Sequence, residues 1–105
     1  MAQAVMVFIT VPSAREGRKI GDFLVRKKLA ACVNQLSGVH STYWWKGKVE
    51  TSREELLILK TMSSKMAALI KEAKRNHSYS VPEIIAIPIV QGHSDYLKWI
   101  RASIQ

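Results

Sequence analysis

A short apolar segment near the beginning of the chain constrains the fold more than any other feature. Residues 5–11 read VMVFITV, a continuous apolar run rich in β-branched side chains, and the run ends at Pro12. This pattern is typical of a strand that is buried on both faces. Ser13 stands three residues before Glu16, a capping box in which each side chain satisfies the other's backbone N–H. The sequence therefore predicts a buried strand that leads directly into a helix.

Three segments repeat apolar residues every three or four positions, which is the spacing of an amphipathic helix. In the helix that follows Ser13, the apolar positions are Ile20, Phe23, Leu24 and Leu29. In the second helix they are Met62, Met66, Leu69, Ile70 and Ala73. The last helix begins near Ser94 or Asp95, because both are good N-caps. Its apolar positions are Tyr96, Leu97, Ile100 and Ile104.

Two extended segments in the middle of the chain predict a long hairpin. The first runs from residue 30 to about 45, and Ser37-Gly38 within it indicates a bulge or bend. Lys46-Gly47 fits a hairpin turn, because Gly supplies the positive φ that such turns require. The return strand contains LLIL at 56–59. Residues 52–55 also read as a capping box, but a short continuous apolar run without helical spacing favours a strand.

A fourth apolar run, at 84–90, is an edge or interrupted strand, since Pro82 and Pro88 mark it. The predicted order is β-α-β-β-α-β with a C-terminal helix, the plan of a ferredoxin-like α+β sandwich. A length of 105 residues fits a single domain over 1–105. So short a chain has a modest core of its own, although 48% of its residues are apolar. This balance favours an oligomer that buries further apolar surface.

The net charge of +8 raises the question of nucleic-acid binding. Six of the basic residues fall in the predicted first helix, at Arg15, Arg18, Lys19, Arg26, Lys27 and Lys28. The polar face of such a helix is solvated in any case, and no aromatic residues alternate with these charges as they do in single-strand binders. We therefore expect no nucleic-acid partner.

The chain shows no sign of secretion or membrane insertion. It has no run of eighteen apolar residues and no basic n-region at its start. The sole cysteine, Cys32, has no partner for an internal disulfide. A cytoplasmic location without a membrane partner is the expectation.

Several strings at fixed spacing, distributed over nearly the whole chain, resemble the CutA divalent-cation-tolerance family. The first string is ACVN at 31–34. Next comes S-x-Y-x-W-x-G-x-x-E from Ser41 to Glu50, followed by LILKT at 57–61. The remainder are His77, Tyr79, Pro82, Glu83, Ile84, Pro88, Gly92 and YLKWI at 96–100. Each string alone is weak evidence, but all of them in one order are specific.

The resemblance implies a ferredoxin-like subunit whose long hairpin strands pair across subunits in a homotrimer. It also implies a non-enzymatic sensor or interaction protein, associated with tolerance of or response to divalent metal ions such as copper. No catalysed reaction is attached to the family. Predicted strands near sixteen residues are long for a domain of this size and expose edges that need partners.

Copper or another divalent cation is the cofactor that the family name suggests. Metal-binding members resemble one another in a cysteine at the end of the first strand and two adjacent histidines before Pro-Tyr. Here those positions hold Ile9, Asn76 and His77, and Ser78 replaces the proline. His77 is thus the one candidate metal ligand. The alternative is that His77 makes a hydrogen bond near the end of the second helix.

The resemblance also places five side chains in a cleft between subunits: Lys60, Tyr79, Glu83, Trp45 and Trp99. Such a cleft would bind a small anionic molecule through the lysine ammonium and the aromatic walls. The alternative is that Lys60 and Glu83 form an intersubunit ion pair that fixes the assembly. A different class of function, an enzyme acting on a small metabolite in this cleft, would use the same two residues for proton transfer.

Overall fold

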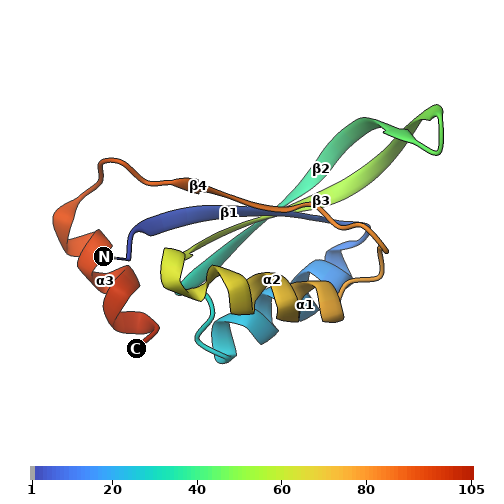
Figure 1. The fold of residues 1–105 in the computed structure, drawn as a ribbon. Coiled ribbons are helices and arrows are strands. Elements are labelled where there is room, and N and C mark those ends of the chain that lie inside the picture. Colours follow the sequence, from blue (N-terminus) through green and yellow to red (C-terminus); the bar gives the residue numbers. More distant parts are fainter. Residues whose placement is uncertain (1) are drawn as a thin grey trace.

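The computed structural model describes residues 2–105 and confirms the predicted ferredoxin-like α+β fold (Figure 1). The elements are β1 (Ala4–Val11), α1 (Ala14–Arg26), β2 (Cys32–Trp45), β3 (Lys48–Met62), the 3-10 turn η1 (Ser63–Lys65), α2 (Met66–Arg75), β4 (Ile84–Pro88) and α3 (Ser94–Ser103). The four strands form one antiparallel sheet in the order β2-β3-β1-β4. Helices α1 and α2 cover one face of this sheet, and α3 lies at one end (Figure 1).

The main core lies between the sheet and these two helices. Alternate residues of β1 (Val5, Val7, Ile9 and Val11) are buried there. They pack with Ile20 and Leu24 of α1 and Leu69 of α2, as the helical spacing predicts. A second, smaller cluster under α3 contains Met62, Ile100 and Ile104.

The opposite face of the sheet, which we call the open face, has no helix over its centre. Met6 and Phe8 of β1 point to this face and are only half-buried, so the prediction that β1 is buried on both faces is wrong for a single chain. In the register of the sheet, Phe8 lies opposite Ile58 and Ile85. The centre of the open face is therefore largely apolar.

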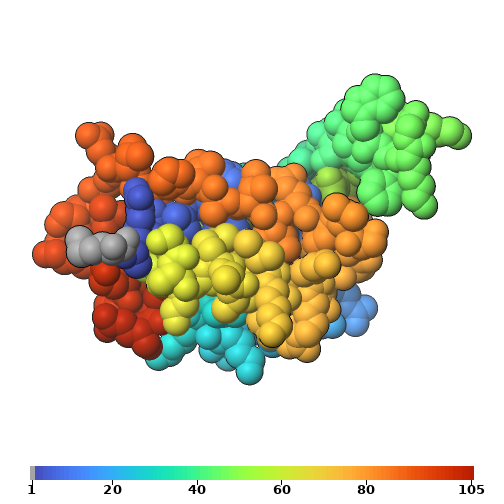
Figure 2. Space-filling model, in the orientation of Figure 1, coloured from blue at the N-terminus to red at the C-terminus, as the bar shows by residue number. Residues whose placement is uncertain are grey.

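The β2–β3 hairpin extends beyond the rest of the sheet and projects from the body of the molecule (Figure 2). Strand β1 pairs with β3 only between residues 55 and 62, which leaves residues 48–54 of β3 paired with β2 alone. The predicted bulge is present, because the register shifts between Leu36 and Val39. The predicted turn is also present, and Lys46 and Gly47 both have positive φ (50° and 79°).

Three local predictions need correction. Only half of the capping box forms: Ser13 Oγ accepts from Glu16 N–H at 3.1 Å, but the Glu16 carboxylate accepts from Ser78 instead. Met62 ends β3 rather than lying in α2, because its side chain lies on the open face under α3. Helix α3 begins at Ser94 as predicted, but its N-cap is His93 rather than Ser94 or Asp95.

Candidate functional site

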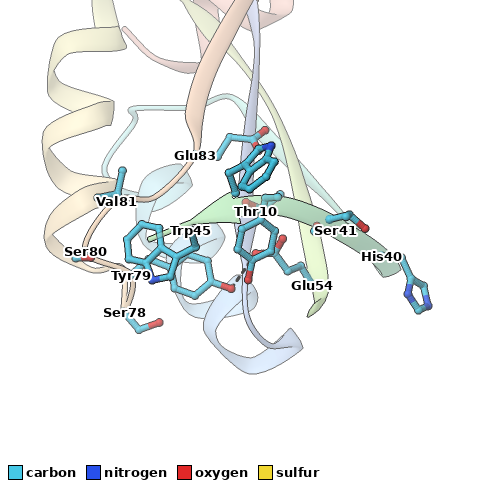
Figure 3. A pocket seen from close by; sticks show the side chains of 13 residues that line it. Thr10, His40, Ser41, Trp45, Glu54, Ser78, Tyr79, Ser80, Val81 and Glu83 are labelled. Atoms are coloured by element: carbon cyan, nitrogen blue, oxygen red, sulfur yellow. Dashed lines mark hydrogen bonds between the residues drawn. The ribbon is translucent and has the colours of Figure 1, made fainter. Parts of the chain in front are cut away.

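A cavity of about 890 Å³ lies where the hairpin leaves the sheet, beside the loop between α2 and β4 (Figure 3). We call it the hairpin pocket. Its aromatic lining residues are Tyr43, Trp44, Trp45 and Tyr79, and its carboxylates belong to Glu54 and Glu83. Its lining includes no lysine and no arginine. The pocket is therefore aromatic and acidic.

Glu54 lies at the base of the hairpin and is only 8% exposed. Its Oε2 accepts a 2.8 Å hydrogen bond from the hydroxyl of Tyr79, which Figure 3 draws as a dashed line. None of the ion pairs among residues 2–105 involves Glu54. Burial, followed by this hydrogen bond, raises the pKa of Tyr79 well above its usual value, so the phenol keeps its proton.

Tyr79 is held in place by His77, which lies two residues earlier in the same loop. The Tyr79 backbone N–H donates to His77 Nδ1 at 3.1 Å, so the imidazole proton is on Nε2, which donates to the Thr10 carbonyl at 2.7 Å. Glu16 accepts from both the backbone N–H and the hydroxyl of Ser78 at 2.9 Å. These bonds attach the loop to the end of β1 and to the start of α1.

The residues present in one chain do not fit a metal centre at His77. Both of its ring nitrogens are already in hydrogen bonds, and its imidazole is buried. Among residues 2–105, no three His, Cys, Asp or Glu side chains gather where they would hold an ion. The geometry matches the alternative expectation, a histidine that hydrogen-bonds near the end of α2. Copper binding stays a prediction.

Of the five residues predicted to share a cleft, the hairpin pocket brings together Trp45, Tyr79 and Glu83. The other two lie elsewhere. Lys60 is six residues along β3 from Glu54, about 20 Å at the rise of a strand, and its ammonium donates to Asn34 Oδ1. Trp99, in α3, stacks on Tyr96 with ring centroids 5.4 Å apart. A single chain therefore does not form the predicted cleft.

Lys60 and Tyr96 nevertheless lie near one another at the far end of the open face. Cys32 is opposite Lys60 in the β2–β3 register, and its Sγ is 3.6 Å from the Tyr96 hydroxyl. This hydrogen bond, with burial, raises the pKa of Tyr96. The chain thus carries two separate groups of residues. One is the acidic hairpin pocket, and the other, which we call the lysine cluster, consists of Lys60, Cys32, Tyr96 and Trp99.

Glu54 is the residue that sequence reasoning missed. A signal was available, because Glu54 has the same strand parity as Leu56, Ile58 and Lys60 and so belongs to the open face. That parity does not reveal burial, however. Tyr79 reaches Glu54 from a loop 25 residues away.

Known proteins share this fold and much of this sequence. The family described as "CutA1 divalent ion tolerance protein" matches residues 5–103. The divalent-cation tolerance protein CutA of Thermus thermophilus is 45% identical over 96 residues, which are 91% of this chain and 93% of that protein. A chloroplastic CutA 1 of Oryza sativa is 47% identical over 95% of this chain, but this chain spans only 56% of its length.

Solved structures give the same result. The Thermus thermophilus protein superposes with a TM-score of 0.95 at 42% identity, covering 97% of this chain and 99% of that one. CutA1 from Oryza sativa also gives 0.95, at 46% identity, covering 98% and 94%. Sequence family and fold agree over nearly every described residue, and the chain belongs to the CutA1 divalent ion tolerance family.

Proposed function

We propose that this chain acts without catalysis, as a ring-shaped homotrimer in the response to divalent metal ions, with a ligand cleft between neighbouring subunits. The observation that carries the proposal is the open face. Leu36, Ile85 and Ile87 are 46%, 53% and 48% exposed on it, next to half-buried Met6 and Phe8. A contiguous apolar surface of this kind marks a protein–protein contact.

The shape of the hairpin supports the same assembly. The outer parts of its two strands pair only with each other. Trp44 and Trp45 near the turn are 74% and 42% exposed. Strands β2 and β4 are the two edges of the sheet, and each presents unpaired backbone groups. A hairpin that reaches past its own sheet can pair with the edge of a neighbour.

The separation of the two residue groups is compatible with a head-to-tail contact. The hairpin pocket and the lysine cluster lie at different ends of the open face, so they meet only if one copy's pocket faces the next copy's cluster. Contacts between two different surfaces close into a ring when the rotation allows. A ring of three matches the trimer that the family resemblance implies.

The rival function, an enzyme in the intersubunit cleft with Lys60 and Glu83 as a proton-transfer pair, cannot use both residues of one chain and would need Lys60 of one copy and Glu83 of the next. Lys60 is level with Met6 of β1, whereas Glu83 precedes Ile84, which is level with Ile9. The two side chains are therefore on the order of 10 Å or more apart along the strands. Proton transfer needs hydrogen-bond reach, about 3 Å.

The assembly is tested by gel filtration with light scattering. We expect a mass of three times the 11.9 kDa of one chain. Ile87→Glu should lower that mass, because it places a charge on the open face. Ile70→Glu is the matched control, since Ile70 is 42% exposed on α2. A wild-type mass of one chain would overturn the proposal.

Direct metal binding is a separate question, which calorimetric titration of metal-stripped protein with Cu(II) answers. The occupied nitrogens of His77 lead us to expect no tight site that depends on this residue. Tight binding of one ion per chain that His77→Ala abolishes would show that His77 leaves its hydrogen bonds for the metal.

The cellular location stays a prediction. Relatives are named both chloroplastic and periplasmic. No described helix is long and apolar enough to cross a bilayer.

A further inference from the structure

We propose, resting on the cleft of the proposed function, that the hairpin pocket binds a small organic cation with Glu54 as the counter-charge. The ligand class is a protonated amine, a guanidinium or a quaternary ammonium. This assignment concerns the half of the cleft that one chain supplies. It differs from the anionic ligand predicted from the sequence, which required Lys60 beside the aromatic walls.

The carboxylate of Glu54 is buried and has no basic partner among the described residues. Buried charges in proteins are paired with an opposite charge, because leaving one unpaired away from water is costly. Glu54 is 8% exposed, its one protein donor is the neutral phenol of Tyr79, and no basic side chain of residues 2–105 pairs with it. Its Oε1 accepts no hydrogen bond from the described residues. This oxygen is not fully buried, and Glu54 lines the hairpin pocket.

The neighbouring residue Glu55 shows what a self-contained buried carboxylate looks like in this chain. It is 9% exposed, but it faces the other side of the sheet. There, Gln35 and Ser37 donate to its Oε1 at 3.1 and 3.0 Å. Glu55 is thus satisfied by the protein, whereas Glu54 has an oxygen directed at an open cavity.

The aromatic rings that line the pocket also favour a cation. Four aromatic rings border the pocket, and indole and phenol faces attract cations through their negative π-clouds. Trp45 already does so in this chain, because the ammonium of Lys46 lies 5.8 Å from the centroid of its ring. Figure 3 shows Trp45, Tyr79 and Glu83 around the same cavity, with His40 pointing away.

Size and composition favour a cation in the half of the cleft that one chain supplies. No lysine or arginine of this chain lines the pocket, so an anion would depend on the next copy's lysine cluster for its counter-charge. The described residues form no group of three metal-binding side chains. A volume of about 890 Å³ falls within the range of small-molecule sites, and a carboxylate among aromatic rings is the chemistry that selects an organic cation over a neutral molecule.

In the proposed trimer the lysine cluster of the next copy faces this pocket, so its Lys60 is the alternative partner of Glu54, and the experiment separates a free cation from that side chain. Calorimetric titration of the full chain, in its native assembly, uses choline, benzylamine and agmatine as probes. The neutral isosteres are 3,3-dimethylbutan-1-ol for choline and benzyl alcohol for benzylamine. Their affinities measure how much binding remains when the ligand keeps its shape but loses its charge. We expect at least one cation to bind about tenfold more tightly than its isostere, or, for agmatine, than either alcohol.

Two variants, with Glu55→Gln as their control, locate the site. Glu54→Gln keeps the shape of the side chain and should weaken cation binding about tenfold, whereas Glu55→Gln, equally buried on the other side, should leave it unchanged. Trp45→Leu should weaken choline more than 3,3-dimethylbutan-1-ol, which tests the cation–π contribution without changing the carboxylate. Circular dichroism confirms that each variant is folded.

The assembly mass separates this inference from the proposed trimer. If the protein is a single chain in solution yet binds a cation through Glu54, the trimer fails and the cation site stands. If no probe binds, or if alcohols bind as tightly as cations, the cation site is overturned while a trimeric mass is unaffected. If no probe binds and Glu54→Gln alone dissociates the trimer, the cation is a side chain of a second copy, which overturns a free ligand.

Discussion

The hydroxyl of Tyr79 donates a 2.8 Å hydrogen bond to Oε2 of Glu54, across 25 residues of sequence. The bond joins the loop after α2 to the base of the hairpin, where β3 has lost its pairing with β1. Tyr79 is the one protein donor to this buried carboxylate among the described residues. The bond is therefore a side-chain link between the base of the hairpin and the loop after α2, in addition to the backbone pairing of the sheet.

We expect Tyr79→Phe to lower the free energy of unfolding by about 1–3 kcal/mol, because it leaves a buried carboxylate without its donor. Urea unfolding followed by circular dichroism measures this at one fixed protein concentration, since assembly makes stability depend on concentration. Tyr43→Phe is the control: its hydroxyl lies 3.2 Å from Ser52 Oγ in an exposed position. Equal effects of the two substitutions would show that the Glu54 contact adds nothing.

The same phenol predicts a loss of stability at alkaline pH. Burial, and then the bond to Glu54, raise the pKa of Tyr79 above the usual 10.0, so above that pH the folded chain holds a proton that the unfolded chain releases. Stability that is fully present below pH 10 must therefore fall as the pH rises further. We expect this fall to be shallower in Tyr79→Phe.

Tyrosinate absorbance provides the independent measurement. Tyr96 also has a raised pKa, caused first by its hydrogen bond to Cys32, so wild-type protein contains two tyrosines that ionise late. Tyr79→Phe should remove one late-ionising group and leave the other. An unchanged late phase in that variant would contradict the assignment.

His77 should matter more to stability than the other histidines. Replacement with Ala removes both the donor to the Thr10 carbonyl and the acceptor for Tyr79 N–H from a buried site, which costs about 1–3 kcal/mol for each group left unsatisfied. His93→Ala is the control, because its exposed side chain makes no capping bond to α3. Thermal unfolding compares the two, and similar midpoints would show that the His77 bonds are dispensable.

Local patterns are sufficient to predict the element order, the bulge and the turn. Each depends on residues adjacent in sequence: the apolar run 5–11 gives β1, and Lys46-Gly47 gives the hairpin. The family resemblance adds the candidate cleft residues, but resemblance carries no coordinates. It cannot show that Tyr79 contacts Glu54, which places the pocket six strand residues away from Lys60.

The wrong predictions share a physical cause, competition from partners distant in sequence. The local pattern assigns the Glu16 carboxylate to its own helix, but Ser78 offers that carboxylate two donors. Helical spacing assigns Met62 to α2, but the register with Ala4 places it under α3. The apolar run predicts burial of both faces of β1, but no element of residues 2–105 covers the centre of the open face.

The end of α1 offers a stabilising substitution. Lys28 has a left-handed conformation, with φ of 58°, which costs a non-glycine residue free energy. Its N–H donates to Val25 O, and Leu29 N–H donates to Leu24 O, both at 3.0 Å. This pair of bonds is the Schellman motif, in which glycine is the preferred residue at the position of Lys28.

We therefore expect Lys28→Gly to raise the free energy of unfolding by about 0.5–1 kcal/mol, because glycine adopts this conformation without the Cβ penalty. The loss of the exposed bond from Lys28 Nζ to Gln105 O opposes only a small part of that gain. Lys27→Gly is the control: Lys27 has an ordinary φ of −81°, so glycine there adds flexibility to the unfolded chain, removes the ammonium that lies 5.7 Å from the centroid of the Phe23 ring, and should destabilise. Opposite signs for neighbouring lysines, measured by urea unfolding, would establish that backbone conformation and not charge sets the effect. Equal changes in both variants would mean that the loss of a positive charge from this basic helix, rather than backbone conformation, determines the change in stability.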